Sequence, residues 1–189
     1  VRPLVSYNES IKKGEIFPAI GAAELQNLAN TYNRVYLENQ ETQKLICHQA
    51  EHDALTEALN RGSYEKLLHI YETGDALFAL ILIDVDIFKS VNDIYGHAVG
   101  DAILQKVTGS LKKAFRSIDY VCRIGGDEFL VLIPGITENL FQSMIRSMLV
   151  DMAKSSVHLA LGSVWVDDCT GKVEKSLSEA DARMYEDKR

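Results

Sequence analysis

The chain of 189 residues is 47% hydrophobic and 25% charged, enough apolar material for one well-packed domain with an appendage. Its net charge of −7 argues against a surface that binds nucleic acid polymers, because such surfaces need dense lysine and arginine contacts to phosphates. Three scattered cysteines without a Cys-x-x-Cys spacing indicate neither a disulfide framework nor a zinc site. No apolar run reaches the roughly 18 to 20 residues of a transmembrane helix, which predicts a soluble chain.

Residues 1–48 contain no strand-like run and are expected to form a helix, a connector and a second helix. In the second helix, side chains suited to a coiled-coil seam recur at alternating steps of three and four. This seam consists of Leu25, Leu28, Tyr32, Val35, Asn39, Thr42 and Ile46. Its polar members, Asn39 and Thr42, predict a weak or switchable contact between helices.

The next domain opens at residues 53–61, and a helix over residues 63–72 follows. Residues 77–83 are continuously apolar, which is typical of a strand buried on both faces, and this strand ends abruptly at Asp84-Val85-Asp86. Helices are expected over residues 88–94 and 101–115, with a glycine-containing loop between them.

Residues 120–124 and 129–133 have strand composition, and Gly125-Gly126-Asp127-Glu128 separates them. This pattern predicts a hairpin with carboxylates at its tip, in which the glycines supply positive φ angles and a close approach to the backbone. Taken alone, the tip is explained equally well as a polar turn. Asp84 at a second strand end favours a functional site over a simple turn, because two acids at adjacent strand ends would form an oxygen-ligand site for Mg²⁺.

A helix over residues 140–152, a strand over 157–166 and a closing helix over 176–188 complete the chain. Gly162 interrupts that strand, and Ser176 is the expected cap of the closing helix. The alternation of strands and helices predicts a mixed α/β sandwich.

These motifs resemble those of the GGDEF domains, diguanylate cyclases that condense two GTP into cyclic di-GMP. The resemblance covers about residues 50–189 and is carried by Asp53-x-Leu55-Thr56, Asn60-Arg61, Asp84-x-Asp86-x-Phe88-Lys89, Asn92-Asp93-x-x-Gly96-His97-x-x-Gly100-Asp101, Gly125 to Phe129, Gly162 and Ala180-Asp181-x-x-x-Tyr185-x-x-Lys188. It implies the five-stranded, antiparallel-centred sheet shared with adenylyl cyclases and polymerase palms. The sequence departs from the family at Glu57, where glycine is usual, and at Ala58, where leucine is usual.

The resemblance implies that Asp84, Asp127 and the backbone carbonyl of Val85 hold Mg²⁺ or Mn²⁺, two ions per site. Metal ions suit this chemistry because nucleotidyl transfer depends on placement and charge neutralisation. Glu128 is expected to be a further ligand or to help deprotonate the attacking 3′-hydroxyl. Asp86 is instead expected to cap the following helix.

The start of that helix suits a triphosphate, because its free N–H groups and positive dipole end face the anion. With the family's late lysine, the expected phosphate-binding residues are Ile87, Phe88, Lys89 and Lys188. Asn92 and Asp101 match the family's guanine-binding residues. A carboxylate accepts from guanine N1–H and N2–H₂, and an amide both donates and accepts.

Five residues separate the Arg116-x-x-Asp119 pattern from Gly125, a spacing similar to the family's inhibitory site for its product. Arginine pairs with a phosphate or guanine through two parallel hydrogen bonds, and aspartate accepts guanine N–H donors. The resemblance therefore implies feedback inhibition by cyclic di-GMP.

Residues 1–48 resemble a HAMP module through Val1-Arg2-Pro3-Leu4, Ile11, Gly14-Glu15, Gly21, Glu24-Leu25, Leu28-Ala29 and Asn33, with an amphipathic helical hairpin as the alternative. The predicted organisation is therefore a HAMP-like segment over residues 1–48 and a GGDEF domain over 49–189. It implies a parent protein anchored in the inner membrane, with this part on the cytoplasmic side.

The predicted function is a diguanylate cyclase that works as a homodimer, because one site holds one GTP and the product joins two. The first alternative is a catalytically silent domain that senses GTP or cyclic di-GMP. Such degenerate domains usually lose acids of the motif, whereas Asp84, Asp127 and Glu128 are all present. The second alternative is a dimerisation unit built on the helix of residues 25–46.

Overall fold

A computed structural model describes Ser10, Lys13, Ile16 and residues 22–73, 77–153, 157–167 and 172–188. The chain divides into two compact units, Val1–Ala50 and Glu51–Arg189. The HAMP-like motifs at residues 1–4, 11, 14–15 and 21 lie outside the described residues, as does Cys169. None of the helices in the described ranges is long and apolar enough to cross a membrane.

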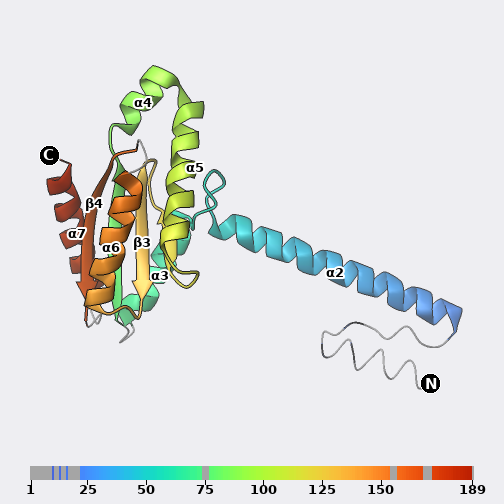
Figure 1. Ribbon diagram of the computed structural model, residues 1–189. Coiled ribbons are helices and arrows are strands. Elements are labelled where there is room, and N and C mark those ends of the chain that lie inside the picture. Colours follow the sequence, from blue (N-terminus) through green and yellow to red (C-terminus); the bar gives the residue numbers. More distant parts are fainter. Residues whose placement is uncertain are drawn as a thin grey trace. The chain divides into compact units, whose positions relative to one another are not determined.

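The first unit is dominated by one long helix, α2 (Ala23–Glu51), which confirms the second helix expected from the sequence (Figure 1). All seven seam residues belong to it. Leu28, Val35 and Ile46 are 57%, 45% and 59% exposed, large fractions for apolar side chains spaced along one helix. Apolar side chains at this spacing are suited to packing against another helix.

The second unit is built on an antiparallel sheet in the order β2-β3-β1-β4. Its strands are β1 (Phe78–Val85), β2 (Tyr120–Arg123), β3 (Glu128–Pro134) and β4 (Leu159–Val166). The antiparallel centre and the hairpin of residues 120–133 are confirmed. The described ranges contain four strands, whereas the resemblance implied five. Leu59 lies beside the β2 edge, where its N–H donates to Val121 and its carbonyl accepts from Arg123.

Helices cover both faces of this sheet (Figure 1). They are α3 (Arg61–Thr73) and α7 (Val173–Asp187) on one face and α5 (His97–Ala114) and α6 (Glu138–Ala153) on the other, while α4 (Phe88–Tyr95) lies at one end of the sheet. In β1, Ile81 and Ile83 pack into the core under α5 and α6, and Leu80 and Leu82 pack into the core under α3 and α7. The prediction of a strand buried on both faces is therefore correct.

Gly162 in β4 lets α7 lie directly on the sheet. A Cβ at this position would overlap the carbonyl oxygen of Ala180 and lie 2.7 Å from the amide nitrogen of Met184. Both are backbone atoms of α7, so no side-chain rotation could relieve the overlap. The glycine thus sets the distance between β4 and α7.

Two expected helix caps are wrong. Helix α7 begins at Val173, so Ser176 lies inside it and donates to the carbonyl of Lys172 instead of capping the helix. Helix α4 begins after Ile87, so Asp86 is not its cap, and Ile87 makes no side-chain capping bond either. Ile87 has φ of 53°, a left-handed conformation that is rare for a β-branched residue and often marks functional sites.

Glu57 also adopts a left-handed conformation, with φ of 58°. The usual glycine of the family therefore has a backbone reason at this position, and a side chain costs about 1 kcal/mol there. We expect Glu57→Gly to raise the unfolding temperature of the second unit by about 2 to 5 °C. Glu57→Ala is the control, because it removes the same side-chain contacts but keeps the Cβ. If both changes stabilise the protein equally, the gain comes from removing the glutamate side-chain contacts and not from relieving the left-handed backbone.

Candidate active site

The acidic ends of β1 and β3 meet at one edge of the sheet. The register places Asp84 opposite Glu128, and the N–H of Val85 donates to the carbonyl of Asp127 at 3.1 Å. Two segments more than forty residues apart thus bring their carboxylates to one place. This is the adjacency of strand ends that the sequence predicts.

A cationic group already lies at this edge. The ammonium of Lys188, just after α7, lies 2.8 Å from Oδ2 of Asp84, whose side chain is buried. The hydrogen bond with Asp84 raises the pKa of Lys188 despite partial burial, and the charges of Asp84, Asp127 and Asp86 add to it. The negative charges of these three carboxylates therefore favour a cation at the Lys188 ammonium. Hard oxygen donors in such an arrangement fit Mg²⁺ or Mn²⁺.

The two glycines of the hairpin tip do not have the positive φ angles expected of them. Gly125 has a different use. A Cβ on Gly125 would meet the carboxylate of Glu128 and lie 3.2 Å from the Glu128 Cβ. Gly125 therefore leaves room for the Glu128 side chain over the turn, beside the half-buried Asp127.

The expected phosphate-binding residues come from two distant parts of the sequence. Ile87, Phe88 and Lys89 lie together where α4 begins, directly after Asp86. Lys188 reaches the edge of the sheet from the opposite end of the unit's sequence and pairs with Asp84. Its side chain is therefore in contact with a predicted metal ligand.

Asn92 lies on α4 and Asp101 lies near the start of α5, and these two helices join at one end of the sheet (Figure 1). Oδ1 of Asn92 is buried and has no hydrogen-bond partner among the described residues. An unsatisfied buried acceptor is costly, so this atom is suited to a ligand that donates a hydrogen bond. The Asp101 side chain is exposed.

Arg116 and Asp119 form a closed pair. The Asp119 carboxylate, which is 0% exposed, accepts from the backbone N–H of Arg116 at 2.8 Å and from its guanidinium at 2.7 Å. This hydrogen bonding raises the pKa of Arg116. Arg116 remains 39% exposed beside a surface cavity of about 420 Å³ that Lys112, Phe115 and Tyr120 also line. Asp119 thus orients Arg116, whose side chain is the exposed member of the pair.

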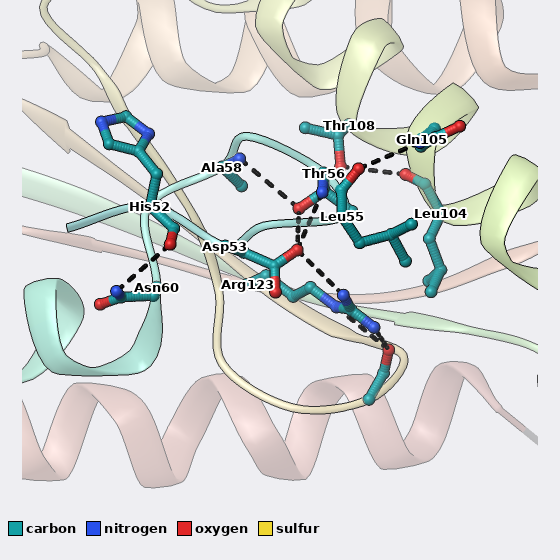
Figure 2. A network of polar contacts seen from close by, with 11 residues as sticks. His52, Asp53, Leu55, Thr56, Ala58, Asn60, Leu104, Gln105, Thr108 and Arg123 are labelled. Atoms are coloured by element: carbon teal, nitrogen blue, oxygen red, sulfur yellow. Dashed lines mark hydrogen bonds and ion pairs between the residues drawn. The ribbon is translucent and has the colours of Figure 1, made fainter. Parts of the chain in front are cut away.

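Sequence reasoning missed the role of Arg123, which Figure 2 shows at the centre of a polar network. Its guanidinium lies 2.9 Å from Oδ1 of Asp53 and donates to the carbonyl of Gly126 at 2.7 Å. Partial burial acts to raise the pKa of Asp53, but hydrogen bonds from Thr56 and Arg123 outweigh it and hold that pKa below its usual value. Arg123 thereby ties the Asp53 turn to the residue before Asp127. A lone arginine in the apolar strand before the glycines was the available signal.

Residues 50–189 match the family described as diguanylate cyclase, GGDEF domain. The chain belongs to the GGDEF family. It is 32% identical to the diguanylate cyclase TpbB of Pseudomonas aeruginosa over 91% of this chain and 44% of that protein. It is 34% identical to the probable diguanylate cyclase DgcE of Escherichia coli, over 80% of this chain and 15% of that one.

The fold agrees with this membership. The coiled coil and GGDEF domain of DgcB from Caulobacter crescentus, solved in complex with c-di-GMP, aligns with a TM-score of 0.74 at 21% identity. That alignment covers 89% of this chain and 95% of the DgcB chain. The chain spans less than half the length of the two curated relatives above.

Proposed function

We propose that this protein is a diguanylate cyclase, which condenses two GTP into cyclic di-GMP and releases two pyrophosphates. The observation that carries the proposal is the meeting of the acidic strand ends: Asp84 lies opposite Glu128 in the sheet register, and the N–H of Val85 donates to the carbonyl of Asp127. A GGDEF domain that retains these acids has the groups that metal-dependent nucleotidyl transfer requires. The curated names of TpbB and DgcE support the same activity.

In this proposal, Asp84, Asp127 and the carbonyl of Val85 hold two Mg²⁺ or Mn²⁺ ions. When bound, these ions neutralise the triphosphate and polarise the reacting groups. Glu128 assists removal of the proton from the attacking 3′-hydroxyl. The N–H groups at the start of α4 and the side chain of Lys89 bind the phosphates.

Lys188 has two partners in the proposed cycle. Its ammonium neutralises Asp84 before the substrate arrives, as its 2.8 Å distance to that carboxylate supports. When cations and triphosphate occupy the site, Lys188 binds a phosphate oxygen instead. The guanine is bound by Asn92 and Asp101, and the buried, unpartnered Oδ1 of Asn92 supports a base that donates hydrogen bonds.

The test is to incubate the protein with GTP and Mg²⁺ and to identify the product by chromatography and mass spectrometry. Cyclic di-GMP is expected. A protein that binds GTP or cyclic di-GMP without turnover would be the silent sensor, and one whose unfolding temperature responds to neither would be a dimerisation unit. Either outcome would overturn the proposal.

Catalysis requires two domains to face each other, because each 3′-hydroxyl attacks the α-phosphate of the other GTP at about 3 to 3.5 Å. We infer that α2 forms a parallel coiled coil whose packing controls this encounter. The exposed seam side chains support it, as does the coiled coil that accompanies the GGDEF domain of DgcB. The parent protein would be an inner-membrane receptor in which a HAMP-like segment passes signals to α2 on the cytoplasmic side.

Replacing Leu28 and Val35 together with glutamate is expected to lower specific activity at submicromolar protein at least about tenfold, because charges in the seam oppose helix pairing. Activity should rise more steeply with protein concentration, while GTP binding per subunit is kept. Glutamate at Leu37 and Leu45, which are exposed on α2 but outside the seam, is the matched control. Unchanged activity in the seam variant would show that α2 only connects segments of the chain and does not control catalysis.

Product inhibition is proposed to act through Arg116, with Asp119 holding it in place. Arg116→Lys is the informative change, because alanine would leave the buried Asp119 carboxylate without a cation. Lysine keeps the charge but loses the two-pronged contact, so the inhibition constant of cyclic di-GMP should rise about tenfold. Arg146→Lys on α6 is the control. An unmodified enzyme that does not slow as product accumulates would contradict this site.

A further inference from the structure

The side chain of Asn92 lies against a glycine of the neighbouring helix. A Cβ on Gly100 of α5 would overlap Oδ1 of Asn92 and lie 3.0 Å from its Cγ. It would also lie 3.2 Å from Cε2 of Phe88, so the Asn92 side chain is confined on that side. The buried position of the Asn92 amide therefore exists only because residue 100 has no side chain.

Helix α5 contains a second glycine that makes this contact specific. A Cβ on Gly109 would meet nothing within 4 Å, and that residue is exposed. Glycine inside a helix is normally a cost, because it loses more backbone freedom than alanine on folding. Gly109 has no packing reason for that cost, whereas Gly100 has one, namely the space that Asn92 fills.

We propose that Gly100 is a positioning residue that determines base specificity: by leaving room for the Asn92 amide, it holds the Asn92 Oδ1 where a guanine N–H donor satisfies it. This rests on the proposed function, since the base is guanine only if GTP is the substrate. Adenine presents no N1–H and no 2-amino group, so it cannot provide those donors at the same edge. With a side chain at residue 100, Asn92 has to rotate or α4 has to shift, and the preference for guanine is lost.

The test compares Gly100→Ala with Gly109→Ala, the same change in the same helix. The probes are the α,β-methylene analogues of GTP and ATP, whose binding is measured by calorimetry without turnover. Gly100→Ala is expected to weaken the GTP analogue about tenfold to a hundredfold, the loss that follows when a buried hydrogen bond is not made, with little effect on the ATP analogue. Gly109→Ala is expected to leave both affinities unchanged and to raise the unfolding temperature.

A double-mutant cycle shows whether Gly100 acts through Asn92. In an Asn92→Ala background the space is vacated, so Gly100→Ala should cost no further affinity and should stabilise the helix as Gly109→Ala does. If Gly100→Ala alone does not fold, the double variant should recover folding. Failure of both to fold, or an equal loss of affinity in both backgrounds, would overturn the role of Gly100.

The outcomes also separate this inference from the function on which it rests. If the unmodified protein prefers the GTP analogue and Gly100→Ala keeps that preference, only the role of Gly100 is wrong. If the unmodified protein binds both analogues equally, the guanine assignment and the proposed cyclase are wrong, and the role of Gly100 in specificity is overturned with them.

Discussion

Asp127→Asn is expected to lower the rate of cyclic di-GMP formation by about 10²- to 10³-fold, because the amide removes a negative charge from a site that neutralises a triphosphate. The fold should survive. Asp127 is half-buried at the hairpin tip, and its backbone carbonyl, which accepts from Val85, is unchanged by the substitution. The loss should therefore fall on metal affinity and turnover rather than on the free energy of unfolding.

The measurement is the initial rate over a Mg²⁺ titration, with Mn²⁺ affinity as a readout that does not depend on turnover. Asp93→Asn, which removes an exposed acid from α4, controls for net charge. Asp84→Asn should be as damaging to activity and should also release Lys188, whose pKa would fall towards its ordinary value. Full activity in either Asp127→Asn or Asp84→Asn would remove that residue from the metal site.

Gly162→Ala is expected to lower the free energy of unfolding by about 2 to 3 kcal/mol. This loss is at the upper end of the range for adding one methyl group to a packed core. The added Cβ would meet backbone atoms of Ala180 and Met184, so α7 has to move as a whole away from β4. That movement also strains the end of α7, where the Asp187 carboxylate accepts from the N–H of Leu161 at 2.9 Å. Lys188, the next residue, would then leave Asp84.

Denaturant unfolding of the two alanine variants Gly162→Ala and Gly109→Ala measures this effect. Gly109→Ala is the control, because the identical methyl group enters open space and is expected to stabilise α5. If the two variants unfold at the same denaturant concentration, the close packing of α7 on β4 does not contribute to stability. A loss of stability without loss of Lys188 from the site would show that α7 shifts only locally.

The main features of the fold follow from local patterns. The run of apolar residues in β1 predicts a strand covered on both faces, and both core clusters use it. Its abrupt end at Asp84, with the acids after Gly126, was enough to predict two carboxylates at adjacent strand ends. Patterns of this kind are readable because the period of a strand and the position where it ends are properties of the chain itself.

The roles of single side chains were harder to predict from the sequence. The sequence did not predict that the Asp119 carboxylate is buried and paired with Arg116, and the Asp86 cap was wrong because the helix begins after a left-handed Ile87. The glycines of the hairpin tip were assigned positive φ angles, whereas Glu57 and Ile87 have them. A propensity describes what a residue type usually does, and the surrounding contacts overrule it.

The sequence by itself determined the strands, the long helix α2 and the set of acids, because these depend on neighbours along the chain. Only the tertiary structure decided that Lys188 contacts Asp84, that Arg123 ties Asp53 to the hairpin tip, and that Gly100 makes room for Asn92. The first two contacts join residues at least seventy positions apart, and the third joins two helices. Periodicity predicts which face of an element is buried, but not which distant atom lies against it.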